Sequence, residues 1–234
     1  NVTGTWTYPL TNQMLLTAAG GANHITQTNK RGEGVDINSI QITEQSLDLK
    51  YGAAYGATAG GSSYSTLPRR QYHQQVSLAY VTGTHNFKTG LNLREVKTGD
   101  NSKYGADLFM ANRAILYTFN NQRPVSLQLL ATPTHFEETA RDVAVYAQDQ
   151  WTIRRMTVNL GLRYNDVDMW SPEFVSPAGF FVGERRIPAA EHIPHWKNLS
   201  PRVGGAYDLF GSGKTAIKGS IGRYPDIVRV SPAN

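Results

Sequence analysis

Three neighbouring side chains in a long loop have the types that bind metal ions. Glu191, His192 and His195 offer one carboxylate and two imidazoles, the donors that a divalent transition-metal ion takes, and the indole of Trp196 follows them. Two nearby prolines interrupt the same stretch and indicate an irregular loop. Such a loop fixes no ligand geometry, so we expect no metal here. We predict instead that His192, His195 and Trp196 are solvated or contact a ligand.

Two carboxylate pairs are the other candidates for catalysis, Glu137 with Glu138 and Asp166 with Asp168. A glycosidase holds its two carboxylates at a fixed separation on rigid elements, whereas both pairs fall where predicted strands give way to loops. We interpret them as solvated charges. Because the chain also has no Cys and no Gly-x-Ser-x-Gly motif, we predict that it is not an enzyme and needs no cofactor.

The tripeptide Gly213-Lys214-Thr215 matches part of a phosphate-binding loop. The full pattern needs a glycine where this chain has Asp208, and a helix after the loop. A strand is predicted to follow instead, so the glycines indicate a tight turn.

The chain is basic, with 23 Lys and Arg residues against 18 Asp and Glu residues and a formal net charge of +5. Its arginine pairs are scattered rather than gathered in one stripe with stacking aromatics, so we expect no nucleic-acid partner. Charged residues make up only 18% of the chain, below the roughly 25% of a typical soluble domain. No run of about 18 apolar residues predicts a transmembrane helix, but β-barrels cross membranes without such runs.

The elements that must position these residues are strands, because apolar and polar side chains alternate along most of the chain. Between Met156 and Tyr164, Met, Val, Leu, Leu and Tyr occupy one face and Thr, Asn, Gly and Arg occupy the other. We therefore predict an all-β chain of about ten strands. Their approximate positions are Val2–Tyr8, Gln13–Ala22, Gln74–Thr82, Asn86–Val96, Asn112–Phe119, Val125–Ala131, Arg141–Ile153, Met156–Asp166, Arg202–Phe210 and Lys214–Tyr224.

The connections between these strands alternate in length. Every odd-to-even link is short, such as Arg154–Arg155, whereas the even-to-odd links include the long stretches Asn23–His73 and Val167–Pro201. Successive antiparallel strands turn at opposite ends of a sheet, so this parity puts the tight turns at one end and the long loops at the other. Outer-membrane barrels have this asymmetry. The predicted fold class is an antiparallel up-and-down meander that forms part of a transmembrane β-barrel.

In a barrel, the polar positions of these strands face the lumen. Arg94, Arg163, Arg202 and Lys218 then project inward, where a basic wall would favour an anionic solute. Alternatively, these cations pair with Asp208 and with other carboxylates of the wall or of a plug. A further set of aromatic residues lies near predicted strand ends, where rings either settle at a membrane–water boundary or pack across strands. These residues are Trp6, Tyr8, Tyr146, Trp151, Tyr164, Tyr207 and Tyr224.

An ordered series of segments carries a family resemblance. The segments are Gly83–Gly90, Tyr146–Trp151, Val158–Tyr164, Asn198–Gly204, Tyr207-Asp208 and Gly211–Thr215. Together they resemble the barrel of TonB-dependent outer-membrane receptors, most closely the Oar-like group. The resemblance implies a barrel of about twenty-two strands around an N-terminal plug domain. Ten predicted strands would be a little under half of it.

The same resemblance implies an identity for the whole chain. Residues 1–234 would be a partial receptor barrel, an internal fragment whose plug domain and C-terminal strands lie elsewhere. The protein would be a transporter of the bacterial outer membrane that binds a small-molecule, glycan or peptide ligand at its loops. Its partners would be membrane lipid, its own plug and TonB, which energises import. Two alternatives stay open: a passive or export-linked barrel in the same membrane, and a soluble β-rich carbohydrate-binding or adhesion module.

Overall fold

The computed structural model describes residues 1–29, 41–52, 63–104, 115–129, 134–176, 178 and 183–225. Nearly all regular structure in these ranges is β-strand, accompanied by one short 3-10 helix, η1 (Gln45–Leu47). Among the same residues, no helix has the length and hydropathy that crossing a membrane requires.

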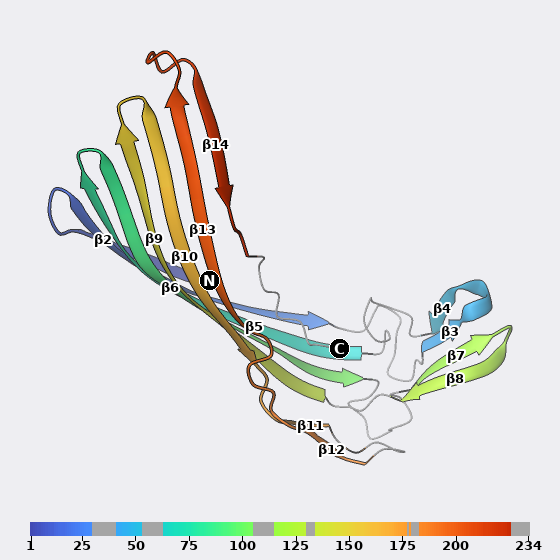
Figure 1. The fold of residues 1–234 in the computed structure, drawn as a ribbon. Helices are drawn as coiled ribbons and strands as arrows, with labels where there is room; N and C mark the ends of the chain where they lie inside the picture. Colours follow the sequence, from blue (N-terminus) through green and yellow to red (C-terminus); the bar gives the residue numbers. More distant parts are fainter. Residues whose placement is uncertain are drawn as a thin grey trace.

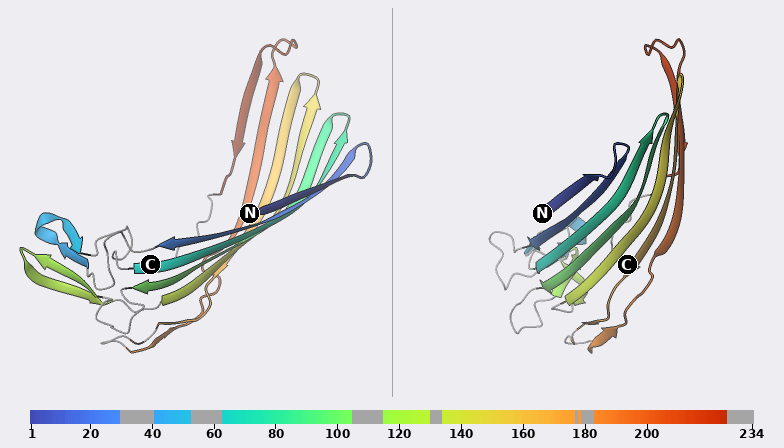
Figure 2. Two further views of the ribbon diagram at one scale, coloured as in Figure 1. Left: turned by 180° about the vertical axis from the view of Figure 1, so that it is seen from behind. Right: turned by 90° about the vertical axis from the view of Figure 1, so that its left-hand side faces the viewer.

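Eight strands form one large antiparallel sheet in which neighbours in sequence order lie side by side (Figure 1). In spatial order they are β1 (Val2–Pro9), β2 (Met14–Asn29), β5 (Ser63–Thr82), β6 (His85–Tyr104), β9 (Thr134–Ile153), β10 (Met156–Trp170), β13 (His195–Asp208) and β14 (Ala216–Gly222). The predicted all-β antiparallel meander is therefore confirmed. The sheet is twisted and curved, as a section of barrel wall is (Figure 2).

Four tight turns join these strands in pairs at one end of the sheet (Figure 1). The predicted turn at Arg154–Arg155 is confirmed, and Arg154 has a φ of 52°. Between β13 and β14, the carboxylate of Asp208 accepts hydrogen bonds from the backbone N–H groups of Gly211 (3.0 Å) and Gly213 (2.8 Å). Both glycines have φ near 70°, a region that other residues rarely adopt. A strand follows, which confirms a turn here rather than a phosphate-binding loop.

Two predicted barrel strands, Asn112–Phe119 and Val125–Ala131, do not belong to the main sheet. The chain instead forms the hairpin β7 (Ile115–Asn120) and β8 (Arg123–Leu129). This hairpin pairs with β3 (Gln41–Glu44), which pairs with β4 (Leu49–Gly52), to give a second sheet in the order β4-β3-β7-β8. The remaining positions of the two predicted strands lie outside the described residues. The alternation of apolar and polar residues indicates that a strand has two unlike faces. It does not indicate which strand lies beside it, so it could not predict this second sheet.

The second sheet lies at the end of the main sheet opposite to the tight turns (Figures 1 and 2). The carboxylate of Glu44 joins its two hairpins, because it accepts hydrogen bonds from the backbone N–H groups of Asn121 (2.9 Å) and Gln122 (3.1 Å). It also accepts from the hydroxyl and the backbone N–H of Ser46. These donors, the Ser46 hydroxyl first among them, lower the pKa of Glu44.

A smaller hairpin, β11 (Phe174–Ser176) with β12 (Arg185–Ile187), also lies in the connection between β10 and β13. The main strands extend into the predicted loops as well. β5, β6 and β9 each have 20 residues, about twice the length needed to cross a membrane in a tilted strand. These strands therefore continue beyond a membrane-sized span at the end with the long connections.

One face of the main sheet is apolar and exposed. Residues paired across an antiparallel ladder point to the same face, and the register aligns Leu160 with Val203 there. Among the described residues, the large apolar side chains left exposed on this face are Val2, Trp6, Tyr8, Tyr72, Val76, Tyr80, Phe87, Leu91, Leu93, Val145, Trp151, Met156, Leu160, Leu162, Tyr164, Leu199, Val203, Tyr207, Ile217 and Ile221. An apolar face of this extent suits contact with hydrocarbon.

The buried apolar residues of the described ranges are few. Ala140, Ala144, Val167 and Met169 are buried, and all four lie on the opposite face of β9 and β10. The apolar face ends along β10 at Tyr164, since the next residues on that side are Asp166 and Asp168. This change in polarity marks where a hydrocarbon-facing band would stop.

Asp149 is an acid within the apolar face. It is paired with Phe87 on one side and with Leu160 on the other. Its Oδ2 atom lies 2.7 Å from Nδ1 of His85, and the His85 ring stacks on Trp151 with 5.3 Å between ring centroids. The pairing satisfies one carboxylate oxygen close to the end of the sheet that carries the tight turns.

Candidate functional site

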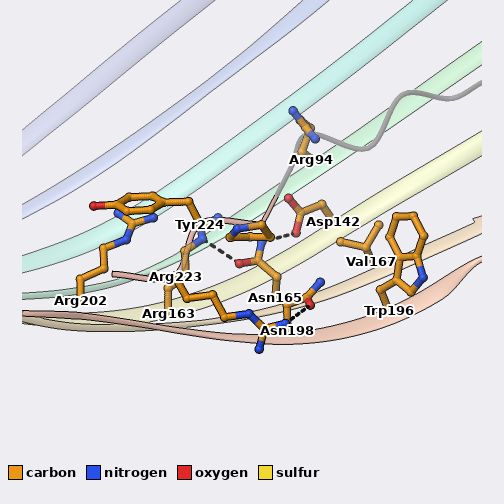
Figure 3. Close-up of a pocket in the computed structure, with 11 residues that line it drawn as sticks. Arg94, Asp142, Arg163, Asn165, Val167, Trp196, Asn198, Arg202, Arg223 and Tyr224 are labelled. Atoms are coloured by element: carbon orange, nitrogen blue, oxygen red, sulfur yellow. Dashed lines mark hydrogen bonds between the residues drawn. The ribbon is translucent and has the colours of Figure 1, made fainter. Parts of the chain in front are cut away.

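A recess of about 560 Å³ lies on the polar face of the main sheet (Figure 3). The strands β6, β9, β10 and β13 provide its floor, and the segment after β14 provides one side. Its lining residues are Arg94, Asp142, Arg163, Asn165, Val167, Trp196, Asn198, Arg202, Arg223, Tyr224 and Pro225. Because each strand contributes alternate residues to this face, side chains far apart in sequence meet in one place.

The recess is strongly basic. Four arginines line it, and Asp142 is the one carboxylate among the described lining residues. Asn165 donates to Oδ1 of Asp142 through Nδ2 (2.8 Å), and Nε of Arg163 donates to Oδ1 of Asn165 (2.9 Å). This relay fixes the guanidinium of Arg163 indirectly against the carboxylate. The excess of guanidinium groups favours an anion in the recess.

Two aromatic side chains complete the recess. The guanidinium of Arg202 lies over the ring of Tyr224, 4.4 Å from its centroid, and this cation–π contact holds both groups at the recess wall. Trp196 lines the recess near the end with the long connections and is 47% exposed. An exposed indole in the same recess as four guanidinium groups offers a flat apolar surface to a ligand that also carries negative charge.

Towards the tight turns, the same face continues as a groove with amide and hydroxyl side chains, lined among others by Gln75, Asn92, Gln148 and Ser200. Tyr146 lies over Gly90, its direct partner on β6. A Cβ atom added at Gly90 would lie 2.8 Å from the Tyr146 hydroxyl oxygen and 2.6 Å from a backbone oxygen of β5. The glycine therefore makes room for the tyrosine ring on the lumen side.

The residues predicted to bind a ligand are divided between the two faces. Arg94, Arg163, Arg202 and Trp196 converge on the recess. Lys218 lies on the same face, paired with Ala206, but does not line the recess. His192 and His195 do not line it either, and the register puts His195 on the opposite face with Asp168. Whether any of these residues binds a ligand stays a prediction.

Sequence reasoning missed several members of the recess, namely Asp142, Asn165, Asn198, Arg223 and Tyr224. A signal existed for the first three, because each falls on the polar register of its strand. Asp208, considered as a partner for the inward cations, instead closes the turn after β13. Its role depends on turn geometry that alternation does not report.

The structure describes contacts or burial for three of the four paired carboxylates. Asp166 and Asp168 each contact a histidine ring, with N···O distances of 2.8 Å to His195 and 2.9 Å to His192. The Oε2 atom of Glu138 is shielded from solvent and has no hydrogen-bond partner among the described residues. Burial raises the pKa of Glu138.

Comparison with known proteins identifies a family. The family model described as "Outer membrane beta barrel domain" matches residues 1–232. Among solved structures, the chain is similar to the ferric-catecholate import receptor Fiu from E. coli K12 in its closed form, with 12% sequence identity and a TM-score of 0.48. The similarity covers 88% of this chain and 30% of the Fiu chain, so the chain spans less than a third of that receptor. Comparison with curated proteins gives no match.

Proposed function

Because this chain belongs to the outer membrane beta barrel domain family, we propose that it is part of the barrel wall of a receptor that imports a negatively charged ligand. The family places it in the bacterial outer membrane. The extent of the exposed apolar face supports the proposal that this face contacts lipid there. This setting replaces the alternative of a soluble binding module. The receptor role rests on the recess, and we propose no enzymatic activity.

The observation that carries the proposal is the charge of the recess. Four guanidinium groups face one carboxylate in a space of about 560 Å³, large enough for a small organic anion. Trp196 and Tyr224 add flat apolar surface beside these charges. We propose that Arg94, Arg163 and Arg202 bind acidic groups of the ligand and that Trp196 packs against its apolar part. Lys218 would attract the same ligand at longer range from outside the recess.

Binding can be tested with pyranine, a fluorescent dye that carries several sulfonates, and full-length protein in detergent micelles. Bound dye should quench the fluorescence of Trp196, and the variant Trp196→Phe identifies that part of the signal. We expect Arg202→Gln to raise the Kd for pyranine about ten- to a hundredfold, because a charged hydrogen bond contributes about 1.5–3 kcal/mol. Added salt should weaken binding as well.

Lys218→Gln is the matched control, since it removes one positive charge from the same face outside the recess. It should change the Kd by less than about twofold, because screening weakens a charge that does not touch the dye. Equal losses from both substitutions would contradict a specific recess. Binding that occurs only after removal of a plug domain would instead assign these arginines to plug carboxylates.

Energised import requires the partners that the family resemblance implies, a plug domain and TonB. We expect the full-length protein to bind the purified periplasmic domain of TonB in a titration by calorimetry. A passive or export-linked barrel has no need of this contact. Failure to bind TonB, together with retained binding of pyranine, would keep the anion site and reject energised import.

A further inference from the structure

A cluster of two imidazoles and two carboxylates lies on the side of β10 and β13 that faces away from the recess, beyond Tyr164. Asp168 and His195 are direct partners across the ladder, and Asp166 comes two residues earlier on the same face. His192 completes the cluster from the loop that precedes β13. Nδ1 of His192 lies 2.9 Å from Oδ1 and 3.1 Å from Oδ2 of Asp168, and Nε2 of His195 lies 2.8 Å from Oδ1 of Asp166.

We propose that Asp168, His192 and His195 bind a divalent transition-metal ion, best fitted by Zn²⁺. One donor atom from each of the three residues lies within 4.8 Å of the other two. Bonds of about 2.0–2.2 Å to a tetrahedral ion put neighbouring donors about 3.3–3.6 Å apart. The His192–Asp168 distances are slightly shorter than that spacing, and the His195 donor lies within 4.8 Å of both, so side-chain rotations that even out the three separations admit the ion.

The backbone holds these donors in place. Asp168 and His195 are fixed by the ladder between β10 and β13. The loop that carries His192 is bonded back to β10 and its extension, because Ile193 donates its backbone N–H to the carbonyl of Met169 (2.9 Å). Ser171 and Ala190 exchange two backbone hydrogen bonds of 2.8 and 2.9 Å across the same loop. The irregular loop expected from the sequence is therefore anchored beside the strands, and Asp168 takes the place considered for Glu191.

Asp166 is a positioning residue in this proposal. A histidine ring that binds a metal through one nitrogen commonly donates its other N–H to a carboxylate, which fixes the ring and raises its basicity. The contact between Asp166 and Nε2 of His195 has this form. The side chain of His192 is 63% exposed, so a fourth coordination position is open to water or to a group of an incoming ligand.

The charges around the cluster favour a transition metal over Ca²⁺ or Mg²⁺. Arg141 on β9 is the ladder partner of Asp168, and Lys197 on β13 is the ladder partner of Asp166. These two cations offset the two carboxylates, so simple charge attraction does not concentrate hard cations here. Two imidazoles suit Zn²⁺ and its neighbours, whereas Ca²⁺ takes six or more oxygen ligands.

The site can be tested by metal titration of the full-length protein, purified without a histidine tag and stripped with EDTA. Calorimetry with ZnCl₂ should show one ion per chain that a hundredfold excess of CaCl₂ does not displace. We expect His192→Ala and His195→Ala each to weaken Zn²⁺ binding at least tenfold. Asp166→Asn should weaken it about tenfold, as loss of a carboxylate behind a metal-bound histidine does.

His24→Ala on β2 is the matched control, because it removes an exposed imidazole far from the cluster along the chain. Its Kd for Zn²⁺ should equal that of the unaltered protein. Heat-dependent electrophoretic migration checks that each variant is folded. Where a variant fails to fold, Co²⁺ added to the unaltered protein replaces it as the test, since a tetrahedral site with imidazole donors gives intense visible absorption.

Several outcomes would overturn the proposal: no Zn²⁺ binding, undiminished binding in the His192→Ala/His195→Ala double variant, equal losses in His24→Ala, displacement by Ca²⁺, or a Co²⁺ spectrum of an octahedral aqueous ion. The metal site and the anion recess lie on opposite faces of the sheet. Failure of one test therefore leaves the other unaffected.

Discussion

Replacing Leu162 by arginine tests whether the apolar face contacts hydrocarbon. Leu162 is 48% exposed and lies between Ala147 on β9 and Pro201 on β13, neither of which can pair with a cation. An arginine near the midplane of a bilayer costs a barrel about 2–4 kcal/mol. We expect Leu162→Arg to reduce the free energy of unfolding by that amount.

Met156→Arg is the matched control on the same strand and the same face. A strand that rises about 3.3 Å per residue with a tilt of about 40° climbs about 2.5 Å per residue along the membrane normal. The step from Met156 to Tyr164, where the apolar face ends along β10, is then about 20 Å, close to the roughly 25 Å height of the apolar band of a barrel. Met156 therefore lies at the margin of the band, where an arginine costs about 0–1 kcal/mol.

Leu160→Arg tests whether a nearby carboxylate offsets the cost of a lipid-facing arginine. Leu160 is as exposed as Leu162, but its ladder partner on β9 is Asp149. An arginine at position 160 can pair with this carboxylate across the ladder. We therefore expect Leu160→Arg to cost less than Leu162→Arg, although both positions lie near the centre of the band.

The assay is equilibrium unfolding of the full-length protein in phosphatidylcholine vesicles, followed by tryptophan fluorescence over a series of guanidinium concentrations. The order of loss should be Leu162→Arg, then Leu160→Arg, then Met156→Arg. Equal penalties at Leu162 and Met156 would refute a lipid-facing wall, because cost would not depend on depth. An unchanged free energy of unfolding in Leu162→Arg would refute it as well.

Three further substitutions test local features of the structure. Glu44→Gln should loosen the β7–β8 turn, which would be measured as faster amide hydrogen exchange in that turn. Because the fold lowers the pKa of Glu44, the ionised carboxylate stabilises the fold above about pH 4.5. This stabilisation is lost as the pH falls through the lowered pKa. Gly90→Ala should cost about 1–3 kcal/mol in the same unfolding assay, because its Cβ meets Tyr146 and backbone, whereas Gly219→Ala, with open space around it, should not. Asp208→Ala should cost about 1 kcal/mol by removing acceptors from the turn after β13, and an unchanged unfolding curve would show that the turn closes without them.

The fold class could be predicted because its cause is local. Alternation along Met156–Tyr164 reports two unlike faces, and the register confirms that these five apolar residues share one of them. The turn at Gly211–Gly213 was predictable because glycine adopts positive φ at low cost. The turn at Arg154–Arg155 was predictable because two residues are enough to close a hairpin. The lumen-side position of Arg163 and Arg202 follows from the same period of two.

Other features depend on which strands pair, and the alternation of apolar and polar residues does not determine strand pairing. β7 and β8 have the pattern of barrel strands, yet β3 pairs with them in a separate sheet and β6 pairs directly with β9. The sequence thus determined that the chain has strands with one apolar face and one polar face. Only the tertiary structure decided that Asp142 joins four distant arginines in a recess and that Asp168 meets His195 on the opposite face. The physical reason is that side-chain direction is set residue by residue, whereas lateral neighbours are set by hydrogen bonds between segments far apart in the chain.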